Sequence, residues 1–276
     1  MGATASGCVG FRTDIHASDG NIGHLKDFQF DDKAWVVRYF VVDAGSWLVS
    51  RKVLISPIGI GAPNWGEKSI PVSITTEQVK DSPAYDEQKP VTKKNEIEFL
   101  GFYNYPYYWG GPSLWGNDIY PSRFSTGSGG FNASPFVLRP REPETEEADV
   151  ELHTLHQLRS GRALIGSSIV GSDGDIGLVK DLLIDERNWA IRYLAIDTGK
   201  WWPGEQVLIA PQWIGEVNWL NSTISINMSR QDVRNATHYD PNVTIDRKLE
   251  IGLHEHYGQP GYWVVEVERG EEVHSD

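Results

Sequence analysis

The stretch from Ser18 to Gly45 reads SDGNIGHLKDFQFDDKAWVVRYFVVDAG, and the stretch from Ser172 to Gly199 reads SDGDIGLVKDLLIDERNWAIRYLAIDTG. The second follows the first at an offset of 154 residues. Over 18–57 and the corresponding positions, eighteen of forty residues are identical without a gap, where unrelated chains would share about two or three. The same offset pairs Trp109 with Trp263. The sequence therefore predicts a tandem duplication of one small domain.

Length, charge and cysteine content limit the classes of protein that the chain can belong to. Its 276 residues suit two domains of roughly 100–150 residues each. The formal net charge is −13, so we expect no nucleic-acid partner, because such partners need a basic surface. Cys8 is the only cysteine, which favours a reducing, cytoplasmic location. No apolar run reaches about 18 residues, so we expect no integral membrane segment.

Short apolar segments separated by turn residues predict a mainly β fold in each copy. In the first copy we expect strands over residues 22–30, 35–42, 53–55, 58–65 and 70–74. The pair Lys26-Asp27 interrupts the first of these strands and recurs as Lys180-Asp181, which is typical of a β-bulge. Such an order of short strands predicts a small closed or nearly closed β-barrel. Short helices are expected after each barrel, over 75–79 and 95–103, and over 229–233 and 249–257.

The copies and the segments between them give a division of the chain into four parts. The first repeat with its helical tail spans residues 9–109, and the second repeat with its tail spans 153–263. Residues 110–152 form a linker that is first rich in Gly, Pro and aromatic residues and then acidic. Residues 264–276 form a C-terminal tail. We expect 127–149 to be the most mobile internal segment, because it has little apolar surface to bury.

The duplicated segment resembles the PRC-barrel domain. The residues that carry the resemblance are DGDIGLVKDLLIDERNWAIRYLAIDTGKWWPGEQVLIAPQWI, from Asp173 to Ile214, and their counterpart from Asp19 to Ile58. The regions downstream of each copy are similar to the helical tails of bacterial stand-alone proteins that carry two tandem PRC-barrel repeats. The resemblance implies a small β-barrel that serves as a docking module, without a catalytic constellation inside the barrel. Members of the family include the cytoplasmic domain of the photosynthetic reaction-centre H subunit and a ribosome-maturation factor.

The resemblance leads to three functional expectations. The first is a non-enzymatic protein-interaction or scaffold module that binds a protein partner, with self-association as an open alternative and no cofactor. The second is an accessory factor of a membrane electron-transfer complex, in which surface carboxylates relay protons. The third is a hydrolase or metal enzyme built on the linker and the histidine-rich segments.

Aromatic residues are the candidate contact residues of such a module. The chain has eleven Trp and eleven Tyr, and the candidates are Trp47, Tyr107, Trp109, Trp201, Trp202 and Pro203. Trp47 and Trp201 correspond to each other, and we expect both to pack against their own barrels. Trp202 has no tryptophan counterpart in the first copy, and we expect it at a contact between domains or chains. The alternative is that these aromatic clusters only cover the surfaces of the barrels.

Charged residues and histidines recur near the expected strand and helix ends. Arg38 precedes Asp43 by five residues, as Arg192 precedes Asp197, and we interpret both as structural ion pairs rather than catalytic groups. The histidine pairs His153/His156 and His254/His256 raise a metal-binding hypothesis. Within a helix, residues two apart point about 200° from each other, so His254 and His256 do not share a ligand face. No metal site is predicted, and the sequence leaves metal binding by these residues open.

Overall fold

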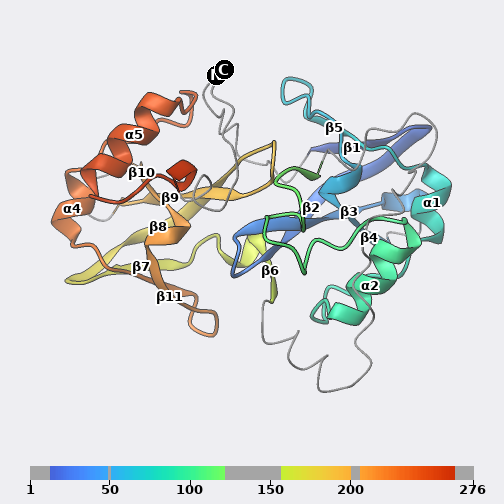
Figure 1. Ribbon diagram of the computed structural model, residues 1–276, viewed down its shortest axis with the longest axis horizontal. Helices are drawn as coiled ribbons and strands as arrows, with labels where there is room; N and C mark the ends of the chain where they lie inside the picture. The colour runs from blue at the N-terminus through green and yellow to red at the C-terminus, as the bar shows by residue number, and fades with distance from the viewer. Residues whose placement is uncertain (1–12, 49–50, 122–156, 200–205, 265–276) are drawn as a thin grey trace. The chain divides into compact units, whose positions relative to one another are not determined.

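The computed structural model describes residues 13–48, 51–121, 157–199 and 206–264. These residues form a mainly β structure with a few short helices, which confirms the predicted fold class (Figure 1). They belong to two compact units. We call the described residues within 13–160, together with Arg187–Trp189, the first unit, and the other described residues within 161–264 the second unit.

The first unit contains a mixed sheet with the strand order β4-β3-β2-β1-β5, and β6 pairs with β2 outside this order. Its strands are β1 (Asp14–Ala17), β2 (Gly20–Asp31), β3 (Val36–Asp43), β4 (Lys52–Ile55), β5 (Ser69–Pro71) and β6 (Leu158–Ser160). The β1–β5 pair is parallel and the other pairs are antiparallel. The sheet thus gains β6 from residues that the sequence places at the start of the second repeat.

The second unit contains a mixed sheet with the order β10-β9-β8-β7-β12-β11. Its strands are β7 (Ser168–Gly171), β8 (Gly174–Ile184), β9 (Ile191–Asp197), β10 (Gln206–Ile209), β11 (Ile214–Asn218) and β12 (Thr223–Ile226). The order β10-β9-β8-β7-β12 repeats β4-β3-β2-β1-β5 at the offset seen in the sequence, including the parallel pair β7–β12. In the described part of the chain, no strand pairing joins the outermost strands of either sheet.

The central strands β3 and β9 are covered on both faces, as their continuous apolar sequences predict. Residues 36–42 of β3 and 191–196 of β9 are all buried, including the charged side chains of Arg38 and Arg192. The register between β2 and β3 shifts at Leu25/Asp27, and that between β8 and β9 shifts at Val179/Asp181. The β-bulge predicted at Lys26-Asp27 and Lys180-Asp181 is therefore confirmed in both sheets.

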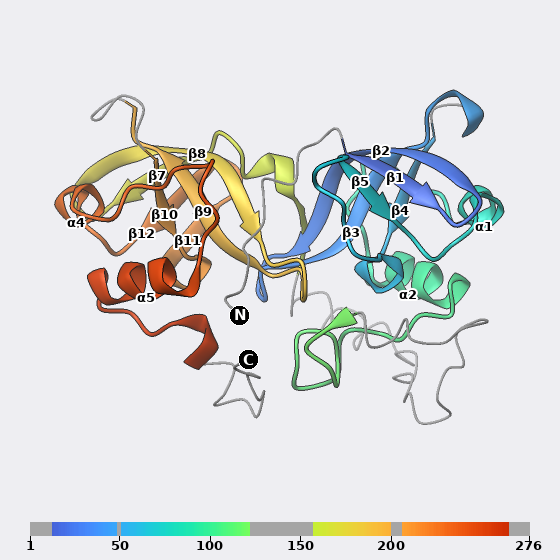
Figure 2. The ribbon, with the colours of Figure 1, turned by 90° about the horizontal axis from the view of Figure 1, so that it is seen from above.

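Among the described residues, two α-helices of each unit follow its first five or six strands, and the longer one lies beside the sheet (Figure 2). They are α1 (Thr76–Asp81) and α2 (Lys93–Phe102) in the first unit, and α4 (Arg230–Arg234) and α5 (Arg247–His256) in the second. The predicted threonine N-cap is confirmed: the Thr75 hydroxyl accepts a hydrogen bond from the Gln78 amide, and Gln78 bonds back to the cap. Thr92 caps α2 in the same way, and Asp246 caps α5.

The strand predicted over 58–65 is wrong for the first unit. A 3-10 turn covers Pro57–Gly59, and only isolated bridges at Ile60 and Asn64 follow. Pro57 has no amide hydrogen to donate, and the Ser56 hydroxyl accepts from the Ile58 amide, which starts the turn. The second unit has the same turn at Pro211–Trp213, so the turn alone does not decide whether a strand follows. In the second unit the corresponding residues form β11. Strands β1 and β7 were not predicted, because four residues of mixed polarity give no clear alternation.

The hairpin turns between the two longest strands of each sheet use the same backbone conformation. Trp35 has φ of 54° and Trp189 has φ of 60°, a left-handed conformation that is unusual for a bulky side chain. Residues 187–189 belong to the first unit, where the Val37 amide donates to the Trp189 carbonyl at 2.9 Å. The rings of Phe40 and Trp189 lie edge to face at 5.0 Å. The two tryptophans therefore share a conformation but have different neighbours.

Several sequence predictions concern residues outside the described ranges. These are the mobility of 127–149, the metal hypothesis for His153/His156, and the contact roles of Trp201, Trp202 and Pro203. The side chain of Trp47 is likewise not described. None of the helices in the described part of the chain has the length and apolar composition that crossing a membrane requires.

Candidate functional site

The two buried arginines pair with carboxylates other than those predicted. Arg38 Nη2 lies 3.4 Å from Asp31 Oδ2, and Arg192 Nη2 lies 3.2 Å from Asp185 Oδ2. The predicted partners are wrong: Asp43 and Asp197 accept hydrogen bonds from the amides of Gly45 and Gly199.

The geometry of the strands explains this correction. Residues five apart on one strand point to opposite faces, so Arg38 and Asp43 cannot meet. Asp31 pairs with Val36 across the hairpin, and Arg38 lies two residues further along the same face. The ion pair is therefore a diagonal cross-strand contact.

A buried glutamate is the centre of a polar cluster in the first unit. Glu96 lies in the first turn of α2 and is 2% exposed. Its Oε1 lies 2.9 Å from Lys93 Nζ, and its Oε2 accepts hydrogen bonds from the hydroxyls of Tyr39, at 3.0 Å, and Tyr108. Lys93 Nζ also lies 3.6 Å from the centre of the Trp109 ring. We call Lys93, Glu96, Tyr39 and Tyr108 the first glutamate cluster.

The second unit repeats this arrangement with one substitution and one addition. Glu250 Oε1 accepts hydrogen bonds from the hydroxyls of Tyr193 at 3.3 Å and Tyr262 at 3.0 Å. Arg247, which corresponds to Lys93, places Nη1 3.0 Å from Glu250 Oε2. The addition is His254, whose Nε2 lies 3.1 Å from the Tyr193 hydroxyl. We call these five residues the second glutamate cluster.

Burial dominates the ionisation of both clusters. It raises the pKa of Glu250, while the cation of Arg247 acts in the opposite direction. It lowers the pKa of Lys93, against the effect of the Glu96 carboxylate. It also lowers the pKa of His254 and raises the pKa of Tyr193. The ionised form of a group that is buried in either cluster therefore depends for its stability on the ion-pair and hydrogen-bond partners given above.

Tyr108 and Tyr262, which follow the longer helices, also contact the buried arginines of the central strands. Tyr108 lies 4.0 Å from the Arg38 guanidinium, and Tyr262 lies 3.8 Å from that of Arg192. The candidate contact residues Tyr107 and Trp109 are half-buried, and their rings stack at 4.7 Å with an interplanar angle of 10°. The contacts of Trp109 thus include Lys93 of its own unit.

The histidines of α5 have different surroundings. His254 is 2% exposed and its Nδ1 lies 2.9 Å from the carbonyl oxygen of Pro260. His256 is exposed and its Nε2 lies 2.8 Å from the Asp232 carbonyl oxygen. Over the described ranges, no group of three or more His, Cys, Asp or Glu side chains is arranged to hold a metal ion.

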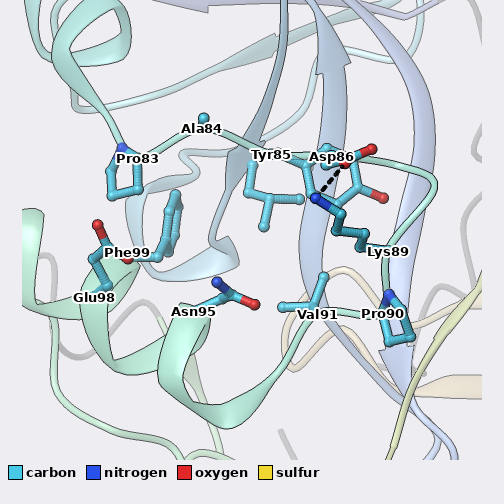
Figure 3. A pocket seen from close by; sticks show the side chains of 11 residues that line it. Pro83, Ala84, Tyr85, Asp86, Lys89, Pro90, Val91, Asn95, Glu98 and Phe99 are labelled. Atoms are coloured by element: carbon cyan, nitrogen blue, oxygen red, sulfur yellow. Dashed lines mark ion pairs between the residues drawn. The ribbon is translucent and has the colours of Figure 1, made fainter.

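A pocket of about 280 Å³ opens between α2 and the loop 83–91 of the first unit (Figure 3). Leu54 and Phe99, which are 7% and 3% exposed, belong to its apolar lining, together with Val91 and the ring of Tyr85. Figure 3 shows Phe99 and Asn95 projecting from α2 toward the loop. The volume is larger than the roughly 150 Å³ that holds a benzene-sized group and smaller than most sites for drug-sized ligands.

The rim of this pocket is polar and carries more acid than base. Asp86 and Lys89 form an exposed ion pair at 3.2 Å, and Glu98 is an exposed acid on α2. Burial raises the pKa of Tyr85 in the wall to about 12, so the phenol stays neutral at physiological pH. In the second unit the residues corresponding to Lys89, Asn95 and Glu98 are Val243, Leu249 and Gly252. Asp86 has an identical counterpart in Asp240, so the part of the rim that is specific to the first unit is Lys89, Asn95 and Glu98.

Sequence reasoning missed both glutamate clusters and the pocket. The signal for the clusters was the repeat itself, because Tyr39, Glu96 and Tyr108 have identical residues 154 positions later. Strand and helix patterns do not reveal that a glutamate in the first turn of a helix points into the sheet. The pocket depends on the irregular loop 83–91, which has no periodicity.

Comparison with known proteins identifies one segment of the chain. Residues 157–223, which include β7 to β10 and reach into β12, match the family profile described as the PRC-barrel domain. No curated protein sequence matches the chain. The segment that builds most of the second sheet is thus similar to a PRC-barrel domain, and the first unit has a sheet of the same strand order.

Proposed function

We propose that this chain is a non-enzymatic protein-interaction module made of two copies of a PRC-barrel-like domain. The profile match over 157–223 supports this for the second unit, and the shared strand order at the 154-residue offset supports a second copy in the first. The hydrogen bonds and ion pairs within the glutamate clusters suit a structural role in both copies, although Arg247 Nη1 and Glu250 Oε2 are paired only by charge, without a hydrogen bond.

The observation that carries the proposal is the pocket of the first unit. It combines an apolar floor with an acidic rim, the arrangement of a site that receives one side chain of a partner and fixes its orientation with polar contacts. A volume of about 280 Å³ fits one large side chain better than a cofactor.

The occupant that fits is a partner segment with a leucine-like side chain next to a lysine or arginine. The apolar side chain would contact Leu54 and Phe99, and the cation would face Glu98. The net charge of −13 adds a long-range attraction for basic partners. A rim ion pair of this kind contributes about 0.2–1 kcal/mol, so the charge sets orientation and selectivity more than affinity.

Binding of short peptides to the full chain tests this function. The probes are two fluorescent capped tetrapeptides, Ala-Leu-Lys-Ala and Ala-Leu-Glu-Ala, followed by fluorescence anisotropy. We expect the lysine peptide to bind more tightly, with a dissociation constant in the millimolar range. Glu98→Lys should weaken its binding by a few fold or more, because the rim charge is reversed.

The second unit offers a matched control for this change of charge. Glu255 is an exposed acid on α5, as Glu98 is on α2. Glu255→Lys alters the net charge by the same amount, so it should leave the affinity nearly unchanged. Equal binding of the two peptides, or equal effects of the two substitutions, would exclude the pocket as the docking site.

A further inference from the structure

The Tyr193 hydroxyl lies between two buried groups that can both accept a hydrogen bond from its single proton. Glu250 Oε1 is 3.3 Å away, and His254 Nε2 is 3.1 Å away. Tyr193 and Glu250 are fully buried and His254 is 2% exposed, so water does not compete for these groups. The number of protons on the three side chains therefore decides whether each polar atom has a partner.

The tautomer of His254 follows from its second nitrogen. Nδ1 lies 2.9 Å from the Pro260 carbonyl oxygen, which can only accept a hydrogen bond. Nδ1 therefore carries a proton, and Nε2 of the neutral imidazole is an acceptor. If Glu250 is ionised as well, two acceptors face one phenolic proton. If Tyr193 donates to Glu250, His254 Nε2 is left without a donor. If Tyr193 donates to His254, Glu250 Oε1 keeps only the hydrogen bond from the Tyr262 hydroxyl, and Glu250 Oε2 is ion-paired with Arg247 without a hydrogen bond, so the buried carboxylate is poorly satisfied.

One additional proton removes this conflict in two ways. In the first arrangement the Glu250 carboxyl is protonated on Oε1 and donates to the Tyr193 oxygen, while the Tyr193 proton goes to His254 Nε2. In the second, His254 is an imidazolium whose Nε2 donates to the Tyr193 oxygen, while Tyr193 donates to Glu250 Oε1. Moving two protons along the same two hydrogen bonds converts one arrangement into the other.

We propose that Glu250, Tyr193 and His254 form a proton-binding site of the second unit, in which one proton is shared between the carboxyl and the imidazole across the phenol. Burial raises the pKa of Glu250 and lowers that of His254, which favours the arrangement with both groups neutral.

Other charged and titratable groups around the site favour or disfavour particular protonation states of Glu250 and His254. From α5, Arg247 favours the ionised form of Glu250 and disfavours the imidazolium. From β9, Arg192 also favours the carboxylate, although it is paired with Asp185 at the end of the hairpin. The Tyr262 hydroxyl donates to Glu250 Oε1. A second proton on the site would create an imidazolium near Arg247 and leave the phenolic proton without an acceptor among these residues.

The first unit contains the same arrangement without the histidine. Leu100 occupies the position that corresponds to His254, and Tyr39 donates to Glu96 without a competing imidazole. The site is therefore an addition to the second copy, and the first glutamate cluster is its internal control.

Nuclear magnetic resonance of the full chain tests the shared proton. The readouts are the ring 15N signals of His254 and the side-chain carboxyl 13C signals of Glu250 and Glu96 over a range of pH. We expect the His254 and Glu250 signals to change with common midpoints, because coupled groups titrate as a pair. In the wild-type chain, a His254 titration that leaves the Glu250 signal unchanged would overturn the proposal.

Two substitutions sharpen the test. His254→Leu frees the Tyr193 proton for Glu250, so the Glu250 midpoint should move to lower pH while Glu96 stays unchanged. Tyr193→Phe removes the bridge, and the two groups should then lose their common midpoints. An unchanged Glu250 midpoint in His254→Leu would contradict the shared proton. If either variant fails to fold, the midpoints of the wild-type chain decide alone.

Discussion

Lys93 and Glu96 form a buried ion pair in the first turn of α2, with 2.9 Å between Nζ and Oε1 and side-chain exposures of 3% and 2%. Lysine and glutamate are rarely buried to this degree unless they are paired. The second copy keeps the pair with arginine in place of lysine, as Arg247 and Glu250. Both members of each pair lie on the helix, and Glu96 and Glu250 also accept hydrogen bonds from Tyr39 and Tyr193 on the central strands, which helps to hold each longer helix to its sheet.

Lys93→Met should destabilise the first unit strongly. The substitution leaves Glu96 buried without its cation, and breaking a buried pair in this way costs about 3–5 kcal/mol. Amide hydrogen exchange of β3 measures this loss in the full chain, because it reports each unit separately.

Two further variants control this prediction. Lys94→Met changes an exposed neighbour on the same helix and should alter the stability by less than about 0.5 kcal/mol. The double variant Lys93→Met/Glu96→Gln should recover part of the loss, since no unpaired charge remains. If the Lys93 and Lys94 variants behave alike, the buried pair has no role in stability.

Acidification should destabilise the second unit once a second proton goes to His254, after the first has been taken up by Glu250, whose raised pKa acts in the opposite direction. The pKa of His254 in the folded chain lies below the ordinary value of about 6.5, so the neutral ring stabilises the fold above that pH. The contribution is lost as the pH falls below about 6.5 toward the folded pKa. Amide exchange of β9, compared between pH 7.5 and 5.5, should show a larger loss in the wild-type chain than in His254→Leu. The same dependence in both proteins would refute the assignment to His254.

Two glycines of the second unit should respond to alanine in opposite directions. A Cβ atom at Gly177 would lie 2.2 Å from the backbone oxygen of Asp197, so Gly177→Ala forces two neighbouring strands apart. Gly252 lies within α5 with no atom near its Cβ position, so Gly252→Ala should stabilise the unit by about 0.5–1 kcal/mol. Urea denaturation followed by β9 amide exchange distinguishes the two. Stabilisation by Gly177→Ala would contradict the close approach of β8 to β9.

The repeat and the apolar pattern were enough to predict the long strands. The segment 35–42 predicted β3 almost to the residue, because a run of β-branched and aromatic side chains buried on both faces is hard to mistake. Thr75 likewise predicted the start of α1, since a capping residue acts locally. Features that are determined by residues close together in the sequence could therefore be predicted from it.

Contacts between elements were harder to predict. Closeness in sequence favours Asp43 as the partner of Arg38, although the alternation of a strand directs the two side chains to opposite faces. The glutamate clusters join a helix to a strand 57 residues earlier, a distance over which no local pattern acts. Only the identity of these residues in both copies marked them in the sequence.

The proposed function depends most on the difference between the two units, and one experiment compares them within the same molecule. Amide signals of the full, 15N-labelled chain are followed while the capped peptide Ala-Leu-Lys-Ala is added. The account predicts shifts at Val91, Asn95 and Glu98 of the first unit that saturate, with Val243, Leu249 and Gly252 of the second unit unchanged. Equal shifts in the two units, or no saturable shift around the pocket, would contradict it.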